Sequence, residues 1–229
     1  MKVAIDGPAG SGKSTVAKAI AKRCGFTLLD TGAMYRSAAL ACVQRGVALD
    51  DSEAVAAVAR EIKISFVPGE ERQTVLLDGQ DVTDAIRTPE IDKAVTPVSA
   101  NPAVREAMVL QQRAIGEQGD VVAEGRDIGT VVFPDAEVKV FLTADPAARA
   151  LRRAVQRDGG DAAKDATATA DENAVAEIMA DLIRRDQADS TRAASPLKPA
   201  DDAVHIDSSD MTIEEVVEAI CDLARKAQG

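Results

Sequence analysis

The sequence predicts an α/β fold in which a five-stranded parallel sheet carries helices on both faces. Short apolar segments alternate with segments of helical spacing, and this alternation is typical of a parallel sheet. Two segments interrupt the alternation, one with the character of a β-hairpin and one with arginine-rich ends. The five expected strands are Lys2–Asp6, Phe26–Asp30, Asp120–Ala123, Val138–Thr143 and Ala203–Asp207.

Capping residues mark the starts of several helices between these strands. Asn101 and Asp145 each precede a proline, so a capping side chain stands before a first-turn proline. Thr212 and Glu215 have the spacing of a capping box. Helices are therefore expected after residues 101, 145 and 212.

The two interruptions predict a small antiparallel hairpin insert and a helical lid. Residues 62–84 read as two or three short strands, with turns at Pro68-Gly69 and Asp78-Gly79. Residues 152–192 read as a helix, a polar connection and a second helix. The connection, 157–173, is acidic and polar, which predicts a mobile segment of the kind that a lid requires.

Composition limits the classes of function. The chain has 229 residues and a net charge of −11, which argues against nonspecific nucleic-acid binding. There is no apolar run of membrane length and the first strand begins at once, so we expect no membrane segment, no signal peptide and a cytoplasmic protein. Cys24, Cys42 and Cys221 have no metal-ligand spacing and are expected to be small buried side chains. Without an apolar repeat, a monomer is expected.

Residues 7–15, GPAGSGKST, fit the phosphate-binding pattern G-x-x-x-x-G-K-S/T between a strand and a helix. In such a P-loop, backbone amides and the helix N-terminus surround an anion. Lys13 would reach the β- and γ-phosphates, and the Ser14 hydroxyl would hold Mg²⁺. A glycine-rich turn with no ligand is the weaker reading, because all the required positions are filled in the right context. The candidate contacts to a nucleoside triphosphate are Gly7, Pro8, Ala9, Gly10, Ser11, Gly12, Lys13, Ser14 and Thr15.

Among P-loop proteins, the sequence favours a small kinase. Neither of the two asparagines lies in the Asn-Lys-x-Asp pattern that a GTPase uses to read guanine. A motor or transporter ATPase would usually need a longer chain. A small kinase needs a second anion site and a lid that excludes water from the transferring phosphoryl group.

Charged residues after the strands supply candidates for that second site. Glu124, Arg126 and Asp127 interrupt the apolar stretch VVAEGRDIGTVVF, and burial of unpaired charges is costly. Arg105 and Arg113 are eight residues apart, which predicts that one helical face carries both. Arginine suits phosphate because its planar fork binds in a bidentate manner, although a single arginine is more often a solvated surface residue.

The segments GPAGSGKST, LLDTGAMYR, AEGRDIGTVVFPDA and RRDQADSTRAASPL, together with the insert, resemble the bacterial cytidylate kinase family nearly from end to end. The segment EGRDIGTVVFPDA makes the resemblance specific, because the P-loop alone indicates only a nucleoside triphosphate. The resemblance implies a P-loop nucleoside monophosphate kinase-like fold and transfer of the γ-phosphoryl group of ATP to CMP or dCMP with Mg²⁺. It implies a single domain with a core at 1–61, 101–151 and 193–229, a monophosphate-binding region at 62–100 and a lid at 152–192.

The resemblance also implies the contacts to CMP. Asp127 would accept a hydrogen bond from the cytosine amino group, where uracil carries a carbonyl oxygen instead. In an alternative reading, Asp127 pairs with Arg126 and merely fixes the loop. Asp189 would bind the ribose together with Arg185, Arg126 would meet phosphate, and Arg36 would hold the CMP phosphate. The remaining expected contacts are Thr31 in the base pocket, Thr96 beside the ribose, and Arg105 on the base or its phosphate.

For catalysis, the resemblance implies that Glu124 orients water on Mg²⁺, with Ser14 as the other metal-site residue. The expected catalytic side chains are Lys13, Arg126, Arg185 and Arg192, with Arg153 and Arg157 as lid contacts to ATP. Two alternatives stay open at this point. One is a P-loop kinase for another small acceptor, and the other is a nucleotide-binding sensor that has lost turnover.

Overall fold

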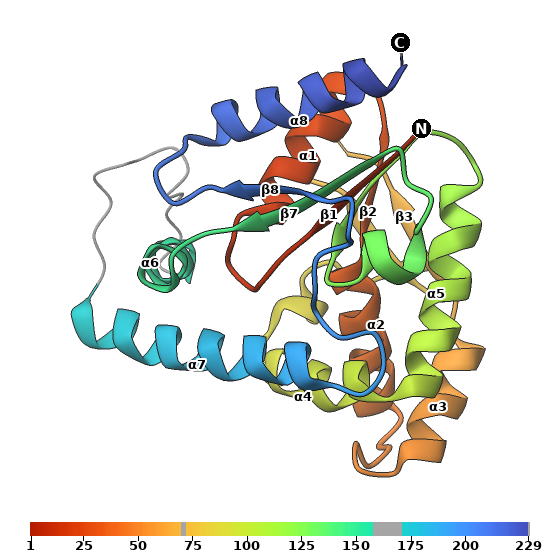
Figure 1. Cartoon of the computed structure of the whole chain (residues 1–229). Coiled ribbons are helices and arrows are strands. Elements are labelled where there is room, and N and C mark those ends of the chain that lie inside the picture. The colour runs from red at the N-terminus through yellow and green to blue at the C-terminus, as the bar shows by residue number, and fades with distance from the viewer. Residues whose placement is uncertain (70–71, 158–170, 229) are drawn as a thin grey trace. The chain divides into compact units, whose positions relative to one another are not determined.

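The structure, a computed structural model, describes residues 1–69, 72–157 and 171–228. It has a five-stranded sheet in the order β2-β6-β1-β7-β8 and a three-stranded sheet in the order β3-β4-β5 (Figure 1). The predicted parallel sheet and antiparallel insert are both confirmed. The strands are β1 (Lys2–Asp6), β2 (Thr27–Asp30), β3 (Ile64–Val67), β4 (Thr74–Leu77), β5 (Gln80–Asp81), β6 (Val121–Gly125), β7 (Val138–Thr143) and β8 (Val204–Asp207).

The helices begin at the predicted capping residues. The side chains of Asn101 and Asp145 accept hydrogen bonds from amides two residues ahead, at 3.0 and 2.8 Å. Thr212 and Glu215 form the reciprocal bonds of a capping box. The helical elements are α1 (Lys13–Cys24), α2 (Thr31–Gln44), α3 (Ser52–Glu61), η1 (Ala85–Arg87), α4 (Pro89–Ala100), α5 (Pro102–Gly116), the π-helical turn η2 (Ile128–Val132), α6 (Pro146–Arg157), α7 (Glu172–Thr191) and α8 (Ile213–Gln228).

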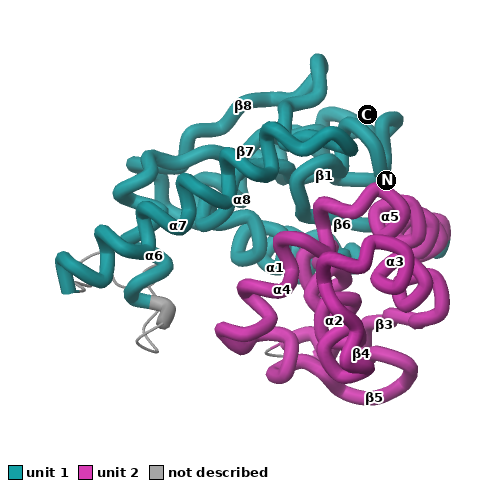
Figure 2. The backbone as a smooth tube through the Cα atoms, turned by 90° about the horizontal axis from the view of Figure 1, so that it is seen from below, with its two compact units in different colours: residues 1–29, 118–229 teal, residues 30–117 magenta. Residues whose placement is uncertain are grey.

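The chain divides into two compact units, which Figure 2 shows in different colours. Unit 1 comprises residues 1–29 and 118–229 and holds the P-loop, helices α1 and α6 to α8, and nearly all of the parallel sheet. Unit 2 comprises residues 30–117 and holds α2 to α5 and the three-stranded sheet. The finer division into core, monophosphate-binding region and lid stays a prediction.

The core of unit 1 lies between the parallel sheet and helices α1 and α8. Alternate side chains of a strand point to opposite faces, so Val3 and Ile5 of β1 enter this core together. Leu142 of β7, Ile20 of α1 and Ile220 of α8 complete its buried centre. Strand β1 pairs in parallel with both β6 and β7, so its carboxyl end meets theirs at one edge. That edge is where open α/β sheets bind ligands.

The turn between β4 and β5 has the geometry that its sequence predicts. Asp78 and Gly79 both have positive φ angles, 50° and 84°, as a tight hairpin turn of this kind requires. The strands that flank the turn pair in antiparallel register, with Leu77 opposite Gln80. The other predicted turn, at Pro68-Gly69, continues into residues 70–71, which lie outside the described residues.

The two helices expected of the lid are present as α6 and α7, and they pack against each other. Ala150 and Ala154 of α6 share a small apolar cluster with Ile178 and Leu182 of α7, and Ala9 of the P-loop joins them. The polar connection for which mobility was expected falls mostly on residues 158–170, outside the described residues.

Two of the cysteines are neighbours in space. Cys24 and Cys221 are 197 residues apart in sequence, yet their Sγ atoms lie 3.8 Å apart between α1 and α8. Cys42 and Cys221 are buried, as expected, and Cys24 is half-buried. Across the described residues, no helix has the length and apolar character needed to cross a membrane.

Replacement of Gly7 by alanine is expected to destabilise the fold at the start of the P-loop. A Cβ atom there would lie 2.1 Å from the Leu142 carbonyl oxygen, and the φ angle of 153° is one that alanine rarely adopts. Urea unfolding should show a loss of about 3 kcal/mol. Gly25→Ala is a matched control with a φ angle of 70° and open space around the added atom, and should cost only about 1 kcal/mol. Equal losses in the two variants would contradict the steric account.

Candidate active site

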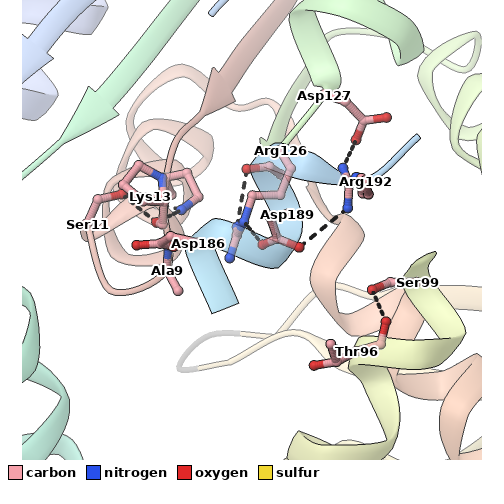
Figure 3. A network of polar contacts seen from close by, with 12 residues as sticks. Ala9, Ser11, Lys13, Thr96, Ser99, Arg126, Asp127, Asp186, Asp189 and Arg192 are labelled. Carbon is pink, nitrogen blue, oxygen red and sulfur yellow. Dashed lines mark hydrogen bonds and ion pairs between the residues drawn. The ribbon is translucent and has the colours of Figure 1, made fainter. Parts of the chain in front are cut away.

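The P-loop folds as the sequence predicts, and Lys13 lies within it. Gly12 has a φ angle of 91° and directly precedes α1, which begins at Lys13. The Lys13 ammonium donates hydrogen bonds to the Pro8 carbonyl oxygen at 2.6 Å and to Ser11 Oγ at 3.3 Å (Figure 3). Ser11 Oγ donates to the same carbonyl at 3.1 Å. The Lys13 ammonium is thus bound by a carbonyl oxygen and a hydroxyl of the P-loop itself.

Lys13 is only 4% exposed, and this burial shapes its chemistry. The pKa of Lys13 is lowered to about 7, chiefly by burial and also by the positive charge of Arg126, while Glu124, Asp6 and Asp186 act in the opposite direction. An anion bound at the loop would favour the charged form of the lysine. The site is therefore suited to a ligand that brings negative charge.

Asp6 lies at the carboxyl end of β1, directly before the P-loop, and sequence reasoning did not select it. Its carboxylate accepts hydrogen bonds from the amides of Ile128 and Gly129, each at 2.8 Å. Burial raises the pKa of Asp6 to about 6, although both amides act to lower it. The sequence feature that could have pointed to Asp6 is its position between an apolar strand and Gly7, the first glycine of the P-loop pattern.

Arg126 and Asp127, which follow β6, form an alternating chain of ion pairs with Asp189 of α7 and with Arg192, the residue after α7. Arg126 Nε donates to Asp189 at 2.9 Å, and Asp189 lies 3.5 Å from Arg192 Nη1. Arg192 Nη2 in turn lies 3.8 Å from Asp127, as Figure 3 shows. The alternative reading paired Asp127 with Arg126, whereas the ion pair seen here joins Asp127 to Arg192. Sequence segments 63 residues apart thus form one cluster.

A second set of contacts ties helices α6 and α7 to the P-loop through Ala9. Arg149 of α6 donates to the Ala9 carbonyl oxygen at 2.9 Å, and the Ala9 amide donates to Asp186 of α7 at 3.0 Å. Arg149 and Asp186 also form an ion pair with each other. Neither side chain was among the sequence-based candidates. We call these three residues the Ala9 clasp.

The other predicted lid residues have different positions. Arg185 is half-buried on α7, and Arg153 is half-buried on α6. Arg152 donates to the Ser208 carbonyl oxygen at 2.7 Å, and burial lowers its pKa. The side chain of Arg157 lies outside the described residues.

Unit 2 carries the remaining candidates. Thr31 is buried at the first turn of α2, which Asp30 caps by accepting the Ala33 amide at 2.8 Å. Arg36, further along α2, donates to the Ile86 carbonyl oxygen at 3.1 Å and forms an ion pair with Asp92. The phosphate contact expected of Arg36 would therefore compete with a carboxylate of its own unit.

Arg105 and Arg113 do not share a face of α5. Arg105 is buried, donates to the Ser99 carbonyl oxygen at 3.1 Å and lies 5.0 Å from the ring centre of Tyr35. Arg113 is exposed. Eight residues at 3.6 per turn leave the two side chains about 80° apart around the helix, so the expectation of one shared face was wrong. Thr96 is exposed on α4, and its carbonyl oxygen accepts from Ser99 Oγ at 3.2 Å.

Oxygen donors suited to Mg²⁺ are present near the P-loop. Ser14 is exposed on the first turn of α1, and the carboxylate of Glu124 is buried near the end of β6. Within the described residues, no group of three or more His, Cys, Asp and Glu side chains could hold a metal by itself. Mg²⁺ commonly uses one or two protein oxygens and completes its shell with water and phosphate, so these donors fit it.

Comparisons with known proteins show the family to which this chain is similar. The family model described as cytidylate kinase matches residues 3–226. A cytidylate kinase from Limosilactobacillus reuteri (strain DSM 20016) is 47% identical over 228 residues, which cover 100% of this chain and 96% of that protein. A cytidylate kinase from Pseudomonas aeruginosa (strain UCBPP-PA14) is 47% identical over 220 residues, covering 95% of this chain and 92% of the relative.

Removal of the Arg149 side chain should loosen both α6 and α7. Arg149→Ala leaves Asp186 and the Ala9 carbonyl oxygen without the guanidinium, and should cost about 2 kcal/mol. Hydrogen exchange should be faster in both α6 and α7. The control Arg184→Ala removes an exposed arginine of α7 whose ion pair with Asp181 is three residues away, and should leave exchange unchanged. Faster exchange confined to α6 would contradict the clasp.

Proposed function

The chain belongs to the cytidylate kinase family, and from that premise we propose that the residues described above transfer the γ-phosphoryl group of ATP directly to CMP or dCMP. The single observation that carries the proposal is the clustering in unit 1 of a buried P-loop lysine with the charge chain Asp127–Arg192–Asp189–Arg126. One end of this cluster suits a polyphosphate, and the other suits a polar base edge.

ATP is assigned to the P-loop. The amides of residues 7–15 and the N-terminus of α1 would surround the phosphates, and Lys13 would move from the Pro8 carbonyl oxygen to the β- and γ-phosphates. Arg153 and Arg157 are assigned to ATP by the family resemblance alone. Ser14 would hold Mg²⁺ and Glu124 would orient water on it, and the metal would supply charge neutralisation of the phosphates.

The contacts to CMP are assigned by the family resemblance. Asp127 would accept the cytosine amino group, which uracil lacks, and Asp189 with Arg185 would bind the ribose. Arg36 would bind the CMP phosphate in exchange for its ion pair with Asp92. Thr31, Thr96 and Arg105 complete the proposed contacts by the family resemblance.

The proposed chemistry is positioning and charge neutralisation. The acceptor is a phosphate oxygen that is already anionic, so the reaction needs no strong base. Lys13, Arg126, Arg185 and Arg192 would surround the γ-phosphoryl group as charge passes to the leaving oxygen. The Ala9 clasp ties α6 and α7 to the donor loop, which supports a role of these helices in excluding water.

We also retain the expectation of a monomeric, cytoplasmic enzyme that binds neither nucleic acid nor membrane. The support is the net charge of −11 and the absence, across the described residues, of a helix that could cross a membrane.

Loss of the P-loop lysine should abolish most of the activity without loss of the fold. Lys13→Ala should lower kcat for CDP formation from CMP and ATP by roughly 10² to 10³. Lys18→Ala, which removes an exposed lysine of the same helix, is the control and should keep the parental rate. A parental rate in Lys13→Ala would contradict the P-loop assignment. Binding of ATP and CMP without CDP formation by the unmodified protein would favour a sensor.

Loss of the Asp127 carboxylate should relax the choice of base. Asp127→Ala should lower kcat/KM for CMP while UMP changes little, so that the CMP/UMP ratio falls by roughly tenfold or more. Asp135→Ala removes an exposed carboxylate of the same segment and should leave the ratio unchanged. AMP completes the acceptor panel. An unchanged ratio in Asp127→Ala would assign Asp127 to the loop structure alone.

A further inference from the structure

Asp127 occupies the capping position of the turn η2 but does not cap it. Aspartate at this position normally accepts a hydrogen bond from the second or third amide of the helix that follows. Here the side chain makes no capping hydrogen bond, although the Asp127 carbonyl oxygen accepts the Val131 amide at 2.9 Å. The first amides of the turn therefore take an acceptor from elsewhere.

That acceptor is Asp6, which lies 122 residues earlier in the chain. Its two carboxylate oxygens each accept one amide, Oδ1 from Ile128 and Oδ2 from Gly129, at 2.8 Å. Asp6 lies opposite Gly125 in the register of β1 and β6, so strand pairing sets how far the Asp6 carboxylate lies from the amides that follow β6. The side chain is 4% exposed, which leaves little room for another arrangement.

There is little space for a side chain at residue 129, next to these hydrogen bonds. A Cβ atom at residue 129 would lie 3.3 Å from the Lys139 side chain and 3.5 Å from Asp6 Oδ2. The tighter of these contacts is with Lys139, whereas the distance to the carboxylate is an ordinary van der Waals contact. The turn also belongs to the rare π-helical class, which is frequent at functional sites.

We propose that Asp6 is a positioning residue for base selection, because it caps η2 in place of Asp127 and so directs the Asp127 carboxylate toward Arg192 and the cytosine. This inference rests on the proposed function of Asp127. Without Asp6, two buried amides would need another acceptor, and the closest carboxylate along the chain is that of Asp127 itself. Local capping by Asp127 would turn its side chain away from the base.

The first test compares Asp6→Asn with the unmodified protein. Asparagine has a similar shape but offers one acceptor oxygen instead of two, so the CMP/UMP ratio of kcat/KM should fall roughly tenfold. Glu137→Gln is the matched control, because Glu137 accepts the Lys2 amide at 2.7 Å at the opposite end of β1. That variant should keep the parental ratio. An unchanged ratio in a folded Asp6→Asn would overturn the proposal.

A double-mutant cycle separates a role through Asp127 from a general structural role. In the Asp127→Ala background, Asp6→Asn should change the CMP/UMP ratio by less than about twofold. A further tenfold loss there would mean that Asp6 acts independently of Asp127, which overturns the inference. If instead the proposed role of Asp127 in base selection were wrong, Asp127→Ala alone would leave the CMP/UMP ratio unchanged. The two failures can therefore be distinguished.

A measurement that leaves Asp6 intact covers the case in which Asp6→Asn does not fold. Amide hydrogen exchange at Ile128 and Gly129 is compared in the unmodified protein and in Asp127→Ala. Because Asp6 caps both amides, their protection should be equal in the two proteins. Loss of protection in Asp127→Ala would show that Asp127 caps the turn, and would overturn the proposal.

Discussion

Charges buried at the carboxyl edge of the parallel sheet must be paired, and the arrangement of unit 1 depends on this constraint. Asp6, Lys13, Glu124, Asp127 and Asp189 are all buried there. A single buried charge without a partner costs several kcal/mol, so each must be matched by an opposite charge or by hydrogen bonds with the backbone. Asp6 is matched by two amides, Lys13 by a carbonyl oxygen, and Asp189 by two arginines. A polyanionic substrate would offer phosphate to the cationic members in place of these partners.

The same constraint joins elements that are distant in sequence. Strands β1 and β6 bring the P-loop and the segment after β6 to adjacent strand ends, and the Asp6 carboxylate connects the two by accepting backbone amides of that segment. Helix α7 contributes at two points, with Asp186 on the P-loop and Asp189 on Arg126. Since these two residues lie three apart on one helix, a displacement of α7 would alter both contacts together. Helix α7 therefore couples the P-loop to the charge chain.

Local patterns predicted much of the fold and part of the site. Strand periodicity, capping residues, the Asp78-Gly79 turn and the P-loop are all encoded within a few residues, and the structure confirms them. Asp6, Arg149 and Asp186 were missed because their roles arise from contacts 122 to 177 residues apart, for which a single acid or arginine gives no local signal. The ion pair between Asp127 and Arg192 was not predicted for the same reason, because the two residues are distant in sequence.

The central claim is that the buried charged side chains of this site bind groups of the protein itself until substrate replaces those partners. A crystal structure with CMP and an unreactive ATP analogue tests it most directly. The account predicts that Lys13 Nζ has left the Pro8 carbonyl oxygen for the triphosphate, with the cytosine amino group within hydrogen-bond distance of Asp127. A complex in which both nucleotides are bound while Lys13 keeps its bond to Pro8 and Asp127 contacts only Arg192 would contradict it.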